Sequence, residues 1–378
     1  MKTVYLDNSA TTRPCTEAVN MINSCLTSNW GNPSSSYTLG IDAMDTLEHA
    51  RKAVAKSIGA KENEIFFTGS GSEANNLALF GAVSAGRKKG NKIVSTAIEH
   101  PSVLEALKEL ESRGFEVVLL SPDKNGIVPE EAFRIAIDKN TILVSVMMVN
   151  NEIGSVQHIE KISQIIREKE SPALLHCDAV QGYGKLPFKV SGLGVDLLSA
   201  SGHKIHASKG IGFLYKSEKA HITPIIFGGG QEKGLRSGTE CVPLIAGLGA
   251  AVNALPNLTE QLKEWEELSL YAKEKLLSIG CVRINSPENA LPCILNISVE
   301  GYKSEPMLNA LAARNIFVSK GSACAKGHRS YVLSVIGLSN DLIDSALRIS
   351  FSRETSKEDI DILCNAIEEI TKKMRRFR

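Results

Sequence analysis

The sequence lacks the marks of several large classes of protein. None of its eight cysteines forms a Cys-x-x-Cys pair, so zinc-ribbon and thioredoxin folds have no support. No apolar run approaches the roughly 18 residues of a membrane span, and the first residues contain no apolar stretch long enough for a secretory signal. The formal net charge is only +1, which gives no argument for nucleic acid or a membrane surface as a partner. Because the cysteines are scattered through a large chain, we expect a reducing, cytoplasmic setting.

The order of apolar segments predicts two regions of different architecture. Strand-like and helix-like segments alternate between about residues 60 and 255, and the run at 141–149 is apolar on both faces. Such runs are typical of strands that helices cover on both sides, so we predict an α/β region with a mainly parallel sheet. After residue 256 comes a long polar helix at 258–279, and then a mixture of strands and helices. This second region predicts a smaller α+β domain.

Two polar residues stand just past the ends of strand-like segments. Lys204 belongs to Ser-Gly-His-Lys after the apolar run at 195–200, and Asp178 follows the run at 173–177. In open parallel sheets, ligands lie beyond the carboxyl ends of the strands. A lysine that forms a Schiff base and a carboxylate that keeps a pyridine nitrogen protonated are what a pyridoxal phosphate site requires. The pair therefore predicts such a site.

A glycine- and serine-rich segment predicts a phosphate-binding helix start. Residues 68–76, Thr-Gly-Ser-Gly-Ser-Glu-Ala-Asn-Asn, follow a strand-like segment and open a predicted helix, where backbone N–H groups suit a phosphate. Two alternatives stay open: a plain capped turn, and the dinucleotide motif G-x-G-x-x-G/A, which Gly69, Gly71 and Ala74 match. The dinucleotide motif also needs an acidic residue at the end of the next strand, and Glu99 comes later than expected.

Three further residues have a functional and a structural interpretation each. His100, between a strand and a helix, is placed either to stack on a flat ring and move a proton or to cap the helix. Asn151 follows an apolar strand, where it either bonds a cofactor oxygen or forms an ordinary turn. Arg348 lies within an apolar strand, where burial requires an anion. That anion is either a substrate carboxylate or an internal ion-pair partner.

Cys324 lies in the segment with the strongest nucleophile signal. Small residues surround it in Gly-Ser-Ala-Cys-Ala, and Lys320, Lys326, His328 and Arg329 lie on either side. Nearby cations lower the pKa of an exposed thiol, so we expect a reactive thiolate, although an inert buried thiol is the alternative. We discount a zinc site at His-x-x-His (residues 203–206), because no further ligands stand at a suitable spacing.

With these motifs in place, the chain resembles the cysteine desulfurases of the NifS/IscS type, pyridoxal phosphate enzymes of the class V aminotransferase family. The resemblance spans nearly the whole length and includes Tyr-Leu-Asp-Asn-Ser-Ala-Thr-Thr at 5–12 and Gly-Asn-Pro-Ser-Ser at 31–35. It implies fold type I of the pyridoxal phosphate transferases, with a mainly parallel seven-stranded sheet in the large domain and a smaller α+β domain. The implied boundaries are 1–15 for an N-terminal segment packed on the small domain, 16–255 for the large cofactor-binding domain and 256–378 for the small domain.

The resemblance also implies roles for individual residues. Lys204 is expected to be the Schiff-base lysine and later a base, His100 to assist proton transfer, and Cys324 to carry the persulfide. The substrate would contact Asn32, Asn151 and Arg348. Thr239 would reach the cofactor phosphate of a second subunit, which implies a homodimer. The full set of expected cofactor contacts is Gly71, Ser72, His100, Asn151, Asp178, Gln181, Ser201, His203, Lys204 and Thr239.

The implied reaction takes sulfur from L-cysteine and leaves L-alanine. The persulfide would pass to an acceptor protein, either an iron–sulfur scaffold or a tRNA- or cofactor-thiolation protein. We expect no direct nucleic acid partner, no membrane and no resident metal, with a transient iron–sulfur contact at Cys324 at most. A selenocysteine lyase or another class V aminotransferase is the nearest alternative, followed by a catalytically silent scaffold and a nicotinamide enzyme. Ala207-Ser208-Lys209-Gly210 departs from the family's usual Gly-Pro-Lys-Gly without removing a catalytic residue.

Overall fold

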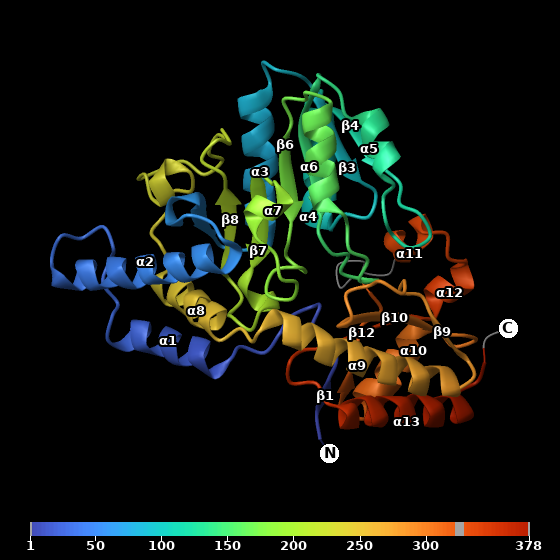
Figure 1. Ribbon diagram of the computed structural model, residues 1–378. Coiled ribbons are helices and arrows are strands. Elements are labelled where there is room, and N and C mark those ends of the chain that lie inside the picture. Colours follow the sequence, from blue (N-terminus) through green and yellow to red (C-terminus); the bar gives the residue numbers. More distant parts are fainter. Residues whose placement is uncertain (1, 322–328, 377–378) are drawn as a thin grey trace.

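A seven-stranded sheet forms the centre of the larger part of the molecule. The computed structural model describes residues 2–321 and 329–376 (Figure 1). The strand order is β2-β8-β7-β6-β5-β3-β4, and only β8 runs antiparallel to its neighbours among these pairs. The predicted α/β fold with a mainly parallel seven-stranded sheet is therefore confirmed. The strands are β2 (Ile65–Thr68), β3 (Lys92–Thr96), β4 (Glu116–Leu120), β5 (Thr141–Met147), β6 (Leu174–Asp178), β7 (Leu197–Ser201) and β8 (Gly212–Lys216).

Helices cover both faces of this sheet, which explains its apolar strands. Every residue of β5 is buried, and the side chains of Leu143 and Val144 belong to two different hydrophobic clusters. One cluster includes residues of α3 and α4, and the other includes residues of α5, α6 and α7. These helices are α3 (Gly71–Gly86), α4 (Pro101–Ser112), α5 (Glu130–Ala136), α6 (Ile159–Glu168) and α7 (Val190–Leu193).

Three helices form a lobe beside the sheet, at the left of Figure 1. Helices α1 and α2 both pack against α8. Chain reversal at the end of α2 uses Gly59, whose φ of 68° is a left-handed conformation that glycine adopts at low cost. The three helices, which we call the α1–α2 lobe, are α1 (Thr16–Thr27), α2 (Thr38–Ile58) and α8 (Val242–Asn253).

The C-terminal part has a small antiparallel sheet of its own, at the lower right of Figure 1. Its strand order is β12-β10-β9. The short strand β1 (Val4–Tyr5) pairs with β11 (Ile316–Phe317), so the N-terminal residues lie on this part. The domain boundaries themselves stay a prediction. The remaining elements are α9 (Leu258–Ser278), β9 (Val282–Ile284), β10 (Ile294–Val299), α10 (Ser304–Ala312), α11 (Tyr331–Val335), α12 (Asn340–Asp344), β12 (Ala346–Ser350) and α13 (Lys357–Lys373).

The length and hydropathy of the described helices can be compared with those of a membrane-spanning helix. Within residues 2–321 and 329–376, no single helix is both long and apolar enough to cross a membrane. Among the helices described, only α8 and α9 taken together, bent by 75° at the break between them, meet that length and composition requirement.

Candidate active site

Most of the predicted site residues line one cavity of about 240 Å³. They come from the N-terminus of α3, from segments after β3, β5, β6 and β7, and from β12. The first five of these positions follow strand ends or open a helix, where ligands of parallel sheets are expected. The predicted residues that line the cavity are Gly71, Ser72, His100, Asn151, Asp178, Gln181, Ser201, His203, Lys204 and Arg348.

Asp178, the last residue of β6, presents a carboxylate held from two sides. Its Oδ2 accepts a hydrogen bond from Asn75 Nδ2 at 2.8 Å, and its Oδ1 accepts one from the backbone N–H of Val180 at 2.9 Å. Asn75 also donates to the hydroxyl of Ser102. No role was predicted for Asn75, although it belongs to the glycine- and serine-rich segment 68–76. A carboxylate fixed in this way is placed to bond a ring N–H group.

Lys204 ends η2 (Gly202–Lys204), a short 3-10 turn directly after β7. Its Nζ donates to the backbone carbonyls of Ser9 at 2.5 Å and Ala10 at 2.9 Å. Burial is the main cause that lowers the pKa of Lys204 from 10.5 to about 7. A lysine with this pKa is partly neutral near neutral pH, and the neutral amine is the form that acts as a nucleophile or base.

His100 combines the two interpretations that the sequence left open. It is the N-cap of α4, and its Nδ1 accepts a hydrogen bond from the backbone N–H of Ser102 at 3.1 Å. It also lines the cavity. Burial is the largest influence on its pKa, which lies below the usual value, so the neutral ring is favoured.

His203 is the second histidine of the cavity. Its Nδ1 lies 3.2 Å from the hydroxyl of Thr11, and its pKa is lowered to about 4, mainly by burial.

The N-terminus of α3 opens into the cavity. Ser70 caps the helix by accepting a hydrogen bond from the backbone N–H of Glu73. A Cβ on Gly71 would lie only 2.7 Å from Val180 Cγ2, so the close approach of this helix start requires glycine. The first N–H groups of a helix have no partner within it and attract anions. Glu99 is fully buried and accepts hydrogen bonds inside the protein, so it does not serve the dinucleotide interpretation.

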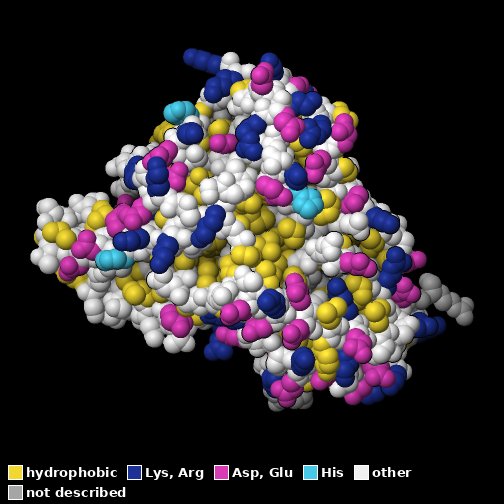
Figure 2. Space-filling model, viewed as in Figure 1, with side chains coloured by type: hydrophobic (Ala, Val, Ile, Leu, Met, Phe, Trp, Pro, Cys, Tyr) yellow, Lys and Arg dark blue, Asp and Glu magenta, His cyan; other side chains and the backbone are white. Residues whose placement is uncertain are grey.

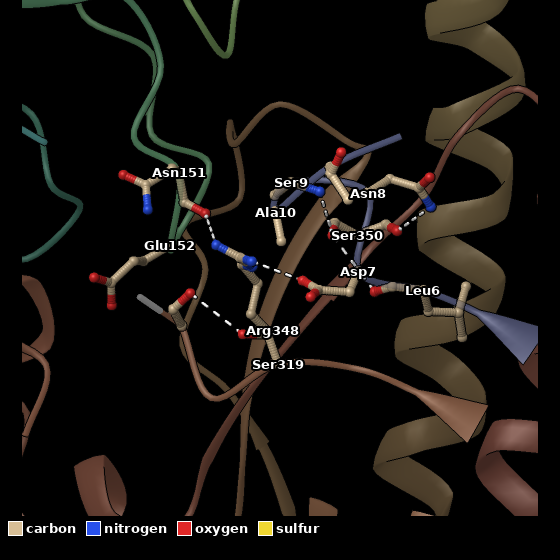
Figure 3. Close-up of polar contacts among 12 residues, drawn as sticks. Leu6, Asp7, Asn8, Ser9, Ala10, Asn151, Glu152, Ser319, Arg348 and Ser350 are labelled. Atoms are coloured by element: carbon tan, nitrogen blue, oxygen red, sulfur yellow. Dashed lines mark hydrogen bonds and ion pairs between the residues drawn. The ribbon is translucent and has the colours of Figure 1, made fainter. Parts of the chain in front are cut away.

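Arg348 from β12 brings a buried guanidinium to the cavity (Figure 3). The residue is 2% exposed. Its Nη2 donates to Asp7 Oδ1 at 2.7 Å, and its Nη1 donates to the backbone carbonyl of Asn151 at 2.9 Å. Its Nε is buried and has no hydrogen-bond partner in the part of the chain that is described. The internal ion pair predicted as an alternative is therefore present, and one donor is left for another acceptor.

The cavity thus has two walls of different construction. We call the surface formed by Asp178, Gln181 and Lys204 the strand-end wall, because all three follow or end strands of the large sheet. We call the surface formed by Arg348 and Asn151, together with Asp7, which binds Arg348, the arginine wall.

Two predicted site residues that the structure describes do not line this cavity, and a third lies outside the described residues. Asn32 is exposed, and its Oδ1 accepts a hydrogen bond from the backbone N–H of Ser34. Thr239 is exposed as well. Cys324 lies outside the described residues, and its roles stay predictions. Arg329, one of the cations near it in sequence, donates to the carboxylate of Asp344.

The described residues hold no evident metal site. Within residues 2–321 and 329–376, no group of three or more His, Cys, Asp or Glu side chains is arranged to bind a metal ion. His206 Nδ1 lies 2.9 Å from the backbone carbonyl of Arg13. The iron–sulfur contact expected at Cys324 lies outside the described part.

Comparison with known proteins places the chain in a family. The model of the family "Aminotransferase class-V" matches residues 4–363. The chain is 40% identical, over 99% of its length and 93% of the other chain, to a protein of Methanosarcina thermophila named cysteine desulfurase IscS. Among solved structures, a "NifS-like protein" is 36% identical with a TM-score of 0.94, covering 99% of this chain and 100% of that one. A structure titled "SspA in complex with cysteine" is 35% identical with a TM-score of 0.82, covering 92% and 99%.

These matches agree with the motifs that carried the resemblance, and they extend over nearly the whole chain rather than over one sheet or loop. The chain therefore belongs to the class V aminotransferase family, among the cysteine desulfurases of the NifS/IscS type.

Proposed function

We propose that this protein is a pyridoxal phosphate-dependent cysteine desulfurase that stores the abstracted sulfur on Cys324. The reaction converts L-cysteine and the Cys324 thiol into L-alanine and a Cys324 persulfide. Atoms balance, because the sulfur of the substrate becomes the outer sulfur of the persulfide. The acceptance of cysteine is supported by a similar protein whose structure is titled as a complex with cysteine.

The observation that carries this proposal is the composition of the cavity. An amine of lowered pKa, a held carboxylate, a neutral imidazole and a guanidinium meet there, although they come from four segments far apart in sequence. A surface or structural role does not require buried ionisable groups of this kind to converge.

The cavity residues fit pyridoxal phosphate by their chemistry. The carboxylate of Asp178 suits a protonated pyridine nitrogen, and the N-terminus of α3 at Gly71 and Ser72, with Ser201 and His203, suits a phosphate. Gln181 offers amide N–H groups at Nε2, one of which donates to the Ser9 carbonyl. When bound, the cofactor supplies an electron sink for bonds broken next to the amino group.

Lys204 and His100 are the residues that would transfer protons at the reacting carbon. Since burial brings the pKa of Lys204 to about 7, the amine both gives and accepts a proton near neutral pH. His100 has its Nδ1 engaged by the backbone N–H of Ser102, which fixes the ring against the helix start. A ring fixed in this way is ready to stack on a flat cofactor.

Arg348 is the residue that would bind the substrate carboxylate. Its Nε has no partner among the described residues, while Asp7 and the Asn151 carbonyl hold the other end of the guanidinium. A planar guanidinium binds a carboxylate with directed hydrogen bonds, so the amino acid would be oriented as well as attracted. The side chain of Asn151 lines the same cavity and completes the expected substrate contacts.

A homodimer would explain why Asn32 and Thr239, which are expected to contact substrate and cofactor, do not line the cavity of their own chain. Both are exposed and lie away from the cavity of their own chain. Large apolar side chains are exposed on the neighbouring α1–α2 lobe, where Figure 2 shows hydrophobic side chains at the left edge. A group of exposed apolar side chains is typical of an interface, and a second copy would bring its Thr239 to the phosphate. The exposed side chains are Val19, Met21, Leu26, Trp30, Tyr37, Leu39, Ile41 and Met44.

We further propose that the persulfide passes to an acceptor protein in the cytoplasm, either an iron–sulfur scaffold or a protein of tRNA or cofactor thiolation. All seven cysteines that the structure describes are free, as expected in a reducing compartment. A persulfide carrier also needs a thiol that is not tied up in a disulfide.

The test is the yield of alanine and of protein-bound sulfane sulfur from L-cysteine. We expect wild-type protein to form both and Cys324→Ala to lose persulfide formation and turnover. Cys241→Ala is the matched control, because Cys241 is the one exposed cysteine among those described. Full desulfuration by Cys324→Ala would refute the persulfide step, and a wild-type protein that binds no pyridoxal phosphate would favour the silent scaffold.

A further inference from the structure

Lys185 is a buried lysine to which the proposed function gives no role. It lies in the turn after β6, is 6% exposed and donates from Nζ to Gln181 Oε1 at 2.7 Å. Among the described residues, no carboxylate lies within the 4.0 Å of an ion pair with it. A buried ammonium group without a counter-charge is costly, so a position that keeps one calls for an explanation.

The hydrogen bond from Lys185 settles which way the amide of Gln181 points. An ammonium group only donates, so the amide oxygen of Gln181 must face Lys185. The amide Nε2 then donates to the carbonyl oxygen of Ser9 at 2.9 Å, and that oxygen only accepts. Both ends of the amide are therefore assigned by their neighbours, and the reversed orientation would place donor against donor.

The same carbonyl oxygen connects Lys185 with Lys204. Ser9 accepts from Gln181 Nε2 and from Lys204 Nζ. Lys185, Gln181, Ser9 and Lys204 thus form one continuous hydrogen-bonded series. It reaches from the buried turn after β6 to the amine in the cavity.

Charged groups around the two lysines act in opposite directions. After burial, Lys185 is the largest contribution that lowers the pKa of Lys204, followed by Arg348, whereas Asp7 and Asp178 raise it. Burial also lowers the pKa of Lys185 itself.

The other groups that face Lys185 oppose each other as well. Arg348 lowers the pKa of Lys185 and the buried thiol of Cys293 raises it. Besides Lys204, Lys185 acts on two imidazoles, because its charge contributes to the lowered pKa of His203 and of His206.

We propose that Lys185 is a positioning residue: its buried ammonium group fixes Gln181 with Nε2 toward the cavity and adds a positive charge behind Lys204. This rests on the proposed function only in that pyridoxal phosphate is the ligand of the cavity. A fixed Gln181 presents a donor to an anionic oxygen of that ligand, and the positive charge disfavours protonation of the Lys204 nitrogen.

Three variants of the cofactor-loaded enzyme separate the charge from the hydrogen bond. Lys185→Met removes both, Lys185→Gln removes the charge but keeps a donor for Gln181, and Lys189→Met removes an exposed lysine from the same segment as a control. The readout is the pH midpoint of the change in the visible absorption of the bound cofactor. The rate of cofactor loss on dilution is measured beside it.

We expect the pH midpoint to rise by about one unit in Lys185→Met and Lys185→Gln, because a nearby positive charge is gone. Cofactor loss should be about tenfold faster in Lys185→Met than in Lys185→Gln, a difference of about one hydrogen bond. Lys189→Met should match the wild type in both. Lys185→Gln also covers the case in which Lys185→Met does not fold.

If the pH midpoints of Lys185→Met and Lys185→Gln lie within about 0.2 pH units of the wild-type midpoint, the role of Lys185 is overturned. The proposed function is not affected by that result. Absence of any visible band in the wild type with pyridoxal phosphate would instead overturn the proposed function and this inference with it.

Discussion

In the strand-end wall, Lys204 bonds two backbone carbonyls and has no described carboxylate within 4.0 Å, whereas in the arginine wall Arg348 donates to the carboxylate of Asp7. Both cations line the same cavity, where Arg348 is buried and Lys204 is half-buried. Burial is the main cause that lowers the pKa of Lys204 to about 7 and makes the amine reactive, while Asp7 holds the guanidinium of Arg348 in position. The type of cation, its burial and its neighbouring charges thus separate a group that exchanges protons from one that binds anions.

Removing the amine from the strand-end wall is the most severe way to break this comparison. We expect Lys204→Ala to lower L-alanine formation by at least about 1,000-fold, because it removes both the nucleophile and the base. The visible band near ~420 nm that pyridoxal phosphate shows when joined to a lysine should disappear. Lys219→Ala, an exposed lysine, is the control and should keep both signals. Retained activity in Lys204→Ala would exclude the proposed chemistry.

Changing the shape of the cation tests the arginine wall. Lysine keeps the charge of Arg348 but loses the planar fork, so Arg348→Lys should raise KM for L-cysteine by roughly 30- to 100-fold and change kcat less. Steady-state kinetics measure the two parameters separately. Arg314→Lys, which alters a partly exposed pair with Glu369, should leave both nearly unchanged. A fall in kcat at constant KM would show that Arg348 serves the chemical step instead.

Removing the counter-charge makes the arginine wall more like the strand-end wall. Asp7→Asn leaves Arg348 buried without its anion and should lower the free energy of unfolding by about 2 kcal/mol, as measured in urea. The surface pair of Arg329 and Asp344 supplies the control, and Asp344→Asn should cost less than about 0.5 kcal/mol. If Asp7→Asn and Asp344→Asn lower the free energy of unfolding equally, burial does not increase the contribution of the Arg348–Asp7 pair to stability.

Glu99 extends the comparison to an uncompensated acid behind the strand-end wall. Burial raises its pKa from 4.5 to about 8, so between these values the folded protein binds a proton that the unfolded chain has lost. Stability must then fall as pH rises through this window, by about 1 kcal/mol per pH unit. Glu99→Gln should remove this part of the slope, which urea unfolding at several pH values measures. Identical slopes in both proteins would show that Glu99 is ionised in the fold.

The sequence predicted those parts of the fold that have a strong local pattern. The apolar run at 141–149 contains strand β5 at 141–147, and the polar helix predicted at 258–279 is α9 at 258–278. The α1–α2 lobe was not predicted. Helices α1 and α2 bury one face each against α8, which lies some 200 positions later in the chain. No local sequence pattern contains that contact.

The site shows the same division between local and distant information. Asp178 and Lys204 were predicted because the end of a parallel strand is readable in sequence. Asn75 was not, because the carboxylate it holds is 103 positions away. The persulfide role of Cys324 rests on the sequence alone, since that residue lies outside the described part.

The sequence by itself determined which chemical groups this protein has at its strand ends, and so the family and the reaction that they suit. Only the tertiary structure decided which charges are compensated. Asp7 contacts Arg348 across 341 positions, whereas the buried Lys185 and the half-buried Lys204 have no described carboxylate in ion-pair range. The physical reason is that the protonation energy of a group depends on its burial and neighbouring charges, and folding alone sets both.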